Sequence, residues 1–313
     1  MKTLFWIISM LTFLSCQTKN AIPKKTLEYL NEAMDLLEEK SVHRNKIDWK
    51  TFRANILKKA KQAKNIEDTY TTLSYAVSTL GDNHSYFKPV NETNTANKPL
   101  PVLSDEVTPG DIGYIRVPFC IGRQDDYVST IRTKLKEQSR KKLKGWIIDL
   151  RGNFWGNMWP MLLSIEPLIG NGVMGYFVDA NNKYQAWKLD KGKVYIDDEL
   201  VMAFKFDEEL DLSNQFLAIL TDHKTASSGE AITVALKSRK RSKSFGNPTY
   251  GVSTGCVAHR LSDGSIINLA ESVFADRTKK KYGLSITPDV IVNQTAALKA
   301  GIDWIYKMHK SAR

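Results

Sequence analysis

The chain has 313 residues, 42% of them hydrophobic and 10% aromatic, and its 45 Lys and Arg against 34 Asp and Glu give a formal net charge of +11. Enough apolar side chain is present to bury a core, which excludes a disordered tail, a collagen-like fibre and a disulfide-packed mini-protein. The length fits one or two domains.

The N-terminus has the layout of a secretory signal peptide. Lys2 supplies the positive start, every residue from Leu4 to Leu14 is apolar or hydroxylic, and small or polar residues follow. This run is too short to cross a bilayer, which takes about 20 apolar residues in a helix. We therefore expect a signal peptide over residues 1–15 and export of the mature protein.

The signal ends in Phe13-Leu14-Ser15-Cys16, which resembles the lipobox of bacterial lipoproteins. In such proteins the Cys is acylated and becomes the new N-terminus, and several acyl chains anchor it firmly to a membrane. We therefore expect lipidation of Cys16, a tether over residues 16–21 and a place in a bacterial cell envelope. Cleavage at a plain signal peptidase site is the alternative.

Two further thiols, Cys120 and Cys256, lie 136 positions apart. An exported protein can join such a pair in a disulfide, but we expect two buried free thiols. Neither has the Cys or His spacing of a zinc site, and the five His residues are scattered along the sequence. We predict no metal.

The basic residues gather in short runs, at Lys134 to Lys144, Lys237 to Lys243 and Lys279 to Lys281. No aromatic ladder or zinc-finger spacing accompanies them, and export separates the protein from nucleic acid. A solvated surface is the favoured interpretation and nucleic acid is not an expected partner. Attraction to anionic lipid stays open.

The first third of the mature chain is predicted to be helical. Apolar residues recur at helical spacing from Leu27 to Leu37, and further helices are expected from about Trp49 to Ala63 and from Asp68 to Leu80. Gly81 suits the C-cap of the last helix. We expect an N-terminal helical cap over residues 22–98.

Strands and helices then alternate, which predicts an α/β core over residues 99–313. Near-continuous apolar runs are typical of strands that are covered on both faces. The expected elements are strands at 112–117, 145–150 and 216–220, helices at 123–138 and 231–237, and hairpins within 172–205 and 256–275.

The segment Thr225-Ala226-Ser227-Ser228-Gly229-Glu230 lies between a buried strand and a helix. A Ser at such a turn points its hydroxyl out of the sheet edge, and the free N–H groups of the first helical turn can hold a developing oxyanion. The same residues also fit an ordinary helix N-cap, in which Ser227 is the N-cap residue and Glu230 completes a capping box with it. Taken alone, this segment favours the N-cap.

Two other segments carry polar residues at turns. Residues 149–161 run from a buried strand through a glycine-containing turn into a helix with Pro near its start. Residues 80–87 place His84 in a polar turn between helix and strand. A lone His is more often structural than catalytic.

In this order, the segments resemble the C-terminal processing (tail-specific) and tricorn-core serine protease family, and most closely its nisin-resistance protease branch. Asp-Leu-Arg-X-Asn-X-Gly-Gly fits residues 149–156, Thr-Ala-Ser-X-X-Glu fits 225–230, and Phe-Gly-X-Pro-Thr-X-Gly fits 245–251. The resemblance implies a crotonase-like (ClpP-like spiral) α/β protease core under the helical cap, without a PDZ domain and without a cofactor.

Two active-site solutions occur in that family, a Ser with a Lys just after the Thr-X-Gly motif and a Ser with a His ahead of the core. The Lys position here is Val252, which cannot accept a proton. Residues 80–87 resemble the His-bearing segment of the nisin-resistance branch. The resemblance thus makes His84 the general base. Asp82 is too near in sequence to be the expected orienting group, and Glu271 and Asp289 are guesses for it.

The resemblance also assigns the remaining roles. Ser227 is the expected nucleophile, and the backbone N–H of Ser228 together with that of Trp155 or Gly156 is the expected oxyanion hole. The residues expected to bind substrate are Asn157, Met158, Glu230, Thr249 and Gly251.

One residue departs from the family pattern, because Trp155 stands where the first Gly of the Gly-Gly pair is expected. A positive φ at this position would cost Trp about 1 to 2 kcal/mol, and its side chain would narrow the cleft. The predicted function is an exported serine endopeptidase that cleaves peptides or unfolded chain ends through a Ser-His acyl-enzyme. The alternative is an inactive relative that binds a peptide or ligand in the cell envelope.

Overall fold

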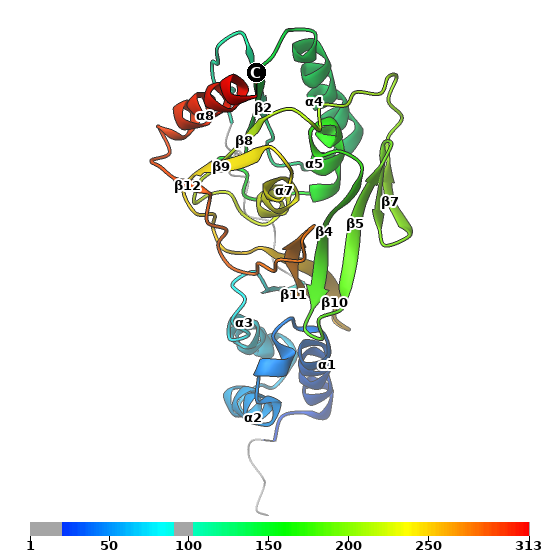
Figure 1. Cartoon of the computed structure of the whole chain (residues 1–313). Coiled ribbons are helices and arrows are strands. Elements are labelled where there is room, and N and C mark those ends of the chain that lie inside the picture. The colour runs from blue at the N-terminus through cyan, green and yellow to red at the C-terminus, as the bar shows by residue number, and fades with distance from the viewer. Residues whose placement is uncertain (1–20, 91–102, 313) are drawn as a thin grey trace, which may run out of the picture.

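Three helices form one end of the molecule (Figure 1), in a computed structural model that describes residues 21–90 and 103–312. They are α1 (Lys24–Lys40), α2 (Trp49–Lys59) and α3 (Tyr70–Ser78), with one-turn 3-10 helices at Arg44–Lys46 and Glu67–Thr69. The predicted signal peptide, Cys16 and the boundary at 98/99 lie outside the described residues. None of the described helices is long and apolar enough to span a membrane.

The helical end shares its core with a neighbouring sheet. Leu30, Met34 and Leu37 of α1 are fully buried together with Leu73 of α3, and they pack against Leu269 of strand β11 (Ile266–Asp276). Burial of a whole apolar side chain stabilises a fold by about 1.5 to 3 kcal/mol. The helices are therefore fixed to the sheet through a continuous apolar core.

Five of the described strands form a parallel sheet in the order β12-β9-β8-β3-β2. Every residue of β3 and β8 is buried, as their apolar composition predicts. The strands are β2 (Ile112–Arg116), β3 (Gly145–Asp149), β8 (Leu217–Thr221), β9 (Ser242–Gly246) and β12 (Val290–Ile291).

Helices cover both faces of this sheet, which explains the absence of polar alternation in its central strands. On one face, Ile148 and Ile219 join a core with α4, α5 and α7. On the other face, Ile147 and Ala218 pack against α8. These helices are α4 (Gln124–Ser139), α5 (Met158–Ser164), α7 (Ser228–Lys237) and α8 (Ala297–Ser311), and the short α6 (Glu166–Ile169) follows α5.

A second, antiparallel sheet lies between the parallel sheet and the helical end (Figure 1), with β1, β11, β4, β5, β6 and β7 in that order and β10 also paired to β11. Its strands are β1 (Tyr86–Lys88), β4 (Gly172–Asp179), β5 (Tyr184–Asp190), β6 (Lys193–Ile196), β7 (Glu199–Ala203), β10 (Thr254–Arg260) and β11 (Ile266–Asp276).

The elements expected from hydrophobic periodicity all occur within a few residues of their predicted bounds. Strand β1 follows the turn at residues 80–87, as expected, whereas strands β9 and β12 and helix α8 were not predicted, β12 being only two residues long. Strand β1 lies inside the range expected for the cap, yet Phe87 pairs with Ile267 of β11. It thereby holds the turn that carries His84 against the antiparallel sheet.

Candidate active site

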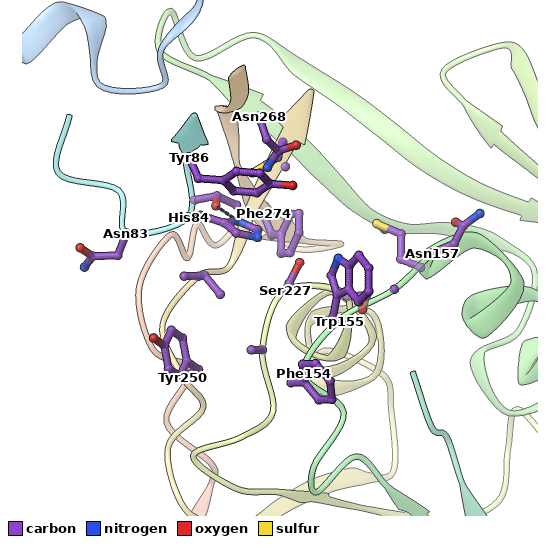
Figure 2. Close-up of a pocket in the computed structure, with 18 of the residues that line it drawn as sticks. Asn83, His84, Tyr86, Phe154, Trp155, Asn157, Ser227, Tyr250, Asn268 and Phe274 are labelled. Carbon is purple, nitrogen blue, oxygen red and sulfur yellow. Dashed lines mark hydrogen bonds between the residues drawn. The ribbon is translucent and has the colours of Figure 1, made fainter. Parts of the chain in front are cut away.

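A cavity of about 770 Å³ opens beside the ends of strands β3 and β8 (Figure 2). Parallel strands bring the loops at their carboxyl ends to one edge of the sheet, where α/β proteins usually bind ligands. Seven of the predicted site residues line this cavity, namely His84, Trp155, Gly156, Asn157, Met158, Ser227 and Ser228.

Ser227 occupies a sharp turn between β8 and α7. Its backbone has φ of 52° and ψ of −112°, a conformation that non-glycine residues rarely adopt and that costs about 1 to 3 kcal/mol. A nucleophilic Ser on a strand-to-helix elbow is strained in this way. Figure 2 shows the Ser227 hydroxyl directed into the cavity, and it makes no capping bond within hydrogen-bond distance.

The Glu230 carboxylate is hydrogen-bonded to the backbone of this turn. It accepts hydrogen bonds from the backbone N–H groups of Ser227 (2.9 Å), Gly251 (3.0 Å) and Val252 (3.0 Å), and from the Thr249 hydroxyl (2.6 Å). Burial raises the pKa of Glu230, and these four bonds oppose that shift. The Glu230 carboxylate thereby fixes the Ser227 backbone, which is the half of the expected capping box that the structure forms at hydrogen-bond distance.

This arrangement contradicts the expectation that Glu230, Thr249 and Gly251 contact the substrate. Glu230 is fully buried, Thr249 is 4% exposed, and neither lines the cavity. Gly251 also lies outside it and borders a separate, smaller hollow. The bonds among these residues show that they support the turn of Ser227 and the chain after β9.

His84 lies across the cavity, in the turn before β1. Asp82 accepts hydrogen bonds from the backbone N–H of His84 (2.8 Å) and of Ser85 (2.6 Å), which fixes the turn. The imidazole Nδ1 is 2.7 Å from the hydroxyl oxygen of Thr254 (Figure 2). In the tautomer that donates this bond from Nδ1, the lone pair is on Nε2.

Burial lowers the pKa of His84, and the negative charge of Asp82 partly opposes this. The neutral imidazole, which can accept a proton, is therefore favoured at neutral pH. Neither residue guessed as the orienting group pairs with His84, because Glu271 pairs with His259 and Asp289 with Lys237. Thr254 was missed because a Thr at the start of a strand carries no signal in a single sequence.

The backbone amides expected to form an oxyanion hole are free. Within the described residues, the N–H groups of Ser228, Trp155 and Gly156 donate no hydrogen bond. The two loops that carry them are joined by the bond from Ala226 N–H to the carbonyl of Asn153 (2.9 Å). Free N–H groups beside a nucleophile can stabilise a developing negative charge.

Gly156, and not Trp155, adopts the conformation that requires glycine. Its φ is 124°, and a Cβ there would lie 2.6 Å from the carbonyl oxygen of Cys120. Trp155 is not among the described residues with positive φ. The strain considered for Trp155 is therefore absent, and its indole faces the cavity.

Two further lining residues sit at the start of α5. Asn157 is the N-cap of this helix, and its side-chain oxygen accepts the N–H of Trp159 (3.0 Å). Met158 lines the cavity and packs against the core. The capping bond leaves the Asn157 amide nitrogen able to donate to a ligand.

Both described cysteines are free thiols, as expected. Cys120 is buried, as expected, whereas Cys256 is only half-buried and lines the cavity. Burial raises the pKa of Cys120 to about 11 and that of Cys256 to about 12, so neither is a reactive thiolate at neutral pH. A Cys nucleophile is therefore not favoured over Ser227.

The sequence matches Peptidase family S41 over residues 111–292, which is more than half of the chain. The chain belongs to peptidase family S41. Because S41 is a family of serine peptidases that includes the C-terminal processing enzymes, this confirms the enzyme class and the family resemblance that the sequence motifs predict. A peptide or protein is accordingly the substrate class.

Relatives of known name extend the similarity beyond the matched segment. The nisin-resistance protein of Lactococcus lactis subsp. lactis is 23% identical over 91% of this chain and 88% of its own. The chloroplastic carboxyl-terminal-processing peptidase 2 of Arabidopsis thaliana is 25% identical over 57% of this chain, but over only 31% of its own length. The first relative therefore matches the helical end as well as the core.

Solved structures show the same fold. A lipoprotein from Streptococcus agalactiae superposes with a TM-score of 0.74 and 25% identity, and the match covers 92% of this chain and 98% of that one. The photosystem II D1 C-terminal processing protease has a TM-score of 0.62 at 16% identity, over 87% and 94% of the two chains. The mixed α/β fold of C-terminal processing proteases is thus confirmed.

Proposed function

We propose that this S41 member is an exported endopeptidase that cleaves peptides through a Ser-His acyl-enzyme mechanism. The observation that carries the proposal is one cavity that holds the strained Ser227, the half-buried His84 with its lowered pKa, and free backbone amides. These are the three parts that acyl transfer needs, namely a nucleophile, a base and donors for the oxyanion.

In the proposed reaction, Nε2 of His84 accepts the proton of the Ser227 hydroxyl while its oxygen attacks the peptide carbonyl. The amides of Ser228 and of Trp155 or Gly156 stabilise the tetrahedral oxyanion. His84 then protonates the leaving amine, and water releases the acyl group by the same steps in reverse order. Thr254 acts as a positioning residue, because its hydroxyl sets the tautomer and the orientation of the ring.

Export, lipidation of Cys16 and a crotonase-like spiral for the core are further parts of the proposal. The N-terminal sequence supports export and lipidation, and the lipoprotein from Streptococcus agalactiae supports an envelope location. A parallel sheet packed beside an antiparallel one is consistent with the third. The nisin-resistance relative supports a peptide as the natural substrate.

The direct test is hydrolysis of unstructured peptides by the mature chain, followed by liquid chromatography and mass spectrometry. We expect defined internal cleavages that His84→Gln reduces by about a hundredfold or more. Because burial lowers the pKa of His84, the acid limb of kcat/KM should lie below pH 6.5, with activity lost only as the pH falls through the lowered pKa. If His84→Gln cleaved as fast as wild type, or if the acid limb of kcat/KM lay above pH 7, His84 would not be the general base.

The Thr254 hydroxyl gives a second test. Thr254→Val keeps the size of the side chain but removes the acceptor of the Nδ1 bond, so we expect kcat to fall by about tenfold to a hundredfold with little change in KM. Thr254→Ser keeps the hydroxyl and should stay within about threefold of wild type. If Thr254→Val and Thr254→Ser had the same kcat, KM and pH profile, a positioning role of the Thr254 hydroxyl would be excluded.

A further inference from the structure

The wall of the cavity is aromatic and carries no carboxylate. Among the described residues that line it, none is Asp or Glu. The side chains that give it this character are Tyr86, Phe154, Trp155, Trp159, Phe177, Tyr250 and Phe274. Lys224 also lines the cavity, so a substrate Lys or Arg side chain meets a like charge and no counter-charge there, whereas the aromatic rings can remove an apolar side chain from water.

Part of this wall is a fixed aromatic floor, formed by Trp159, Phe177 and Phe274. Trp159 meets Phe177 with ring centroids 6.0 Å apart, and Phe177 meets Phe274 at 5.9 Å. The fully buried Trp187 contacts all three rings from behind. Such interlocked rings give the floor a definite shape, because each one limits the rotation of its neighbours.

Trp155 differs from these rings because no described residue stacks on it. Its side chain is 53% exposed, it lines the cavity, and it makes no aromatic contact within the described part of the chain. The preceding Phe154, by contrast, packs on Phe119 with centroids 5.0 Å apart. Trp155, Ser227 and Phe274 all line this one cavity (Figure 2).

An exposed indole that no described ring covers, in the same cavity as the expected nucleophile, is a surface that a ligand can cover. We propose that Trp155 and the aromatic floor form a subsite for a large apolar side chain, preferably aromatic, on the substrate residue next to the cleaved bond. The inference rests on the proposed peptidase function and adds the substrate class to it. Stacking on Trp155 and burial on the floor both favour such a side chain.

The test uses a set of peptides that are identical except for one residue at the cleaved bond, which is Phe, Leu, Ala or Lys. We expect wild type to prefer Phe over Ala by at least tenfold in kcat/KM and to cleave the Lys peptide most slowly. In Trp155→Gly the Phe to Ala ratio should fall by about fivefold to tenfold, and Trp155→Phe should retain most of it. Leu200→Ala, an exposed apolar residue of β7 outside the cavity, is the matched control and should leave the ratio unchanged.

The outcomes separate the subsite from the peptidase function. If wild type cleaves but Trp155→Gly keeps the full Phe to Ala ratio, the subsite is wrong and the peptidase function stands. If wild type cleaves nothing, binding of the same peptides to the Ser227→Ala chain, measured by calorimetry, tests the subsite independently. Equal affinity for the Phe and Ala peptides would then overturn it, and tighter binding of Phe that is lost in Ser227→Ala/Trp155→Gly would support it.

Discussion

Replacing Ser227 with Gly should abolish peptide hydrolysis and at the same time stabilise the fold. Gly adopts the positive φ of this turn without strain, so we expect the free energy of unfolding to rise by about 1 kcal/mol after the greater flexibility of Gly in the unfolded chain is subtracted. Ser227→Ala should be equally inactive but should keep the stability of wild type, because Ala retains a Cβ. Urea unfolding and peptide hydrolysis measure the two effects.

Ser228→Ala is the matched control for the Ser227 variants. The Ser228 hydroxyl is buried without a hydrogen-bond partner among the described residues, whereas the proposed role of Ser228 depends only on its backbone N–H. We therefore expect activity within a few-fold of wild type and no loss of stability. If Ser228→Ala were inactive and Ser227→Ala active, the nucleophile would be Ser228 and not Ser227.

Glu230 should be the most costly polar residue of the site to remove. Glu230→Ala leaves three backbone N–H groups and the Thr249 hydroxyl without their acceptor in a buried place, so we expect a loss of about 3 to 5 kcal/mol in the free energy of unfolding. Glu230→Gln should lose less, about 2 kcal/mol, because one oxygen still accepts. Urea denaturation at neutral pH measures both losses.

The activity of Glu230→Gln should also fall, since the Ser227 backbone loses a fixed partner. Glu137→Ala on α4 is the control, because Glu137 is exposed and should change neither stability nor activity. A Glu230→Ala protein within 1 kcal/mol of wild type would show that the carboxylate does not hold the turn. Full activity in Glu230→Gln would show that the turn does not need it.

The sequence predicts strands β2, β3 and β8 and the strand-to-helix turn at Ser227 because these depend on local patterns, whereas the choice of Ser227 as nucleophile over an N-cap came from the family resemblance. The apolar runs of β3 and β8 are visible as such, and a Ser between a buried strand and a helix is at an elbow wherever the chain folds this way. His84 could be named only through the family resemblance. Its approach to the cavity depends on β1, a strand too short to show a pattern.

The contact of Thr254 with His84 could not be predicted, and the sequence left Glu230 open between a capping box and a substrate contact, because both depend on which atoms meet in three dimensions. A motif that places Glu230 three residues after Ser227 fits a substrate contact as well as it fits a buried acceptor, and only its complete burial decides between them. Thr254 reaches His84 across 170 positions of sequence. The sequence motif shows that Trp155 replaces a family Gly. It does not show the backbone conformation there, in which Gly156, and not Trp155, has the positive φ.

The most direct measurement of the central claim is the reaction of the mature wild-type chain with a fluorophosphonate probe, followed by mass spectrometry of the digested protein. Ser-His activation predicts one adduct, on the Ser227 hydroxyl, that persists in Ser228→Ala and forms far more slowly in His84→Gln. An adduct on Ser228, an unchanged rate in His84→Gln, or no adduct on the folded wild-type chain would contradict the Ser-His mechanism.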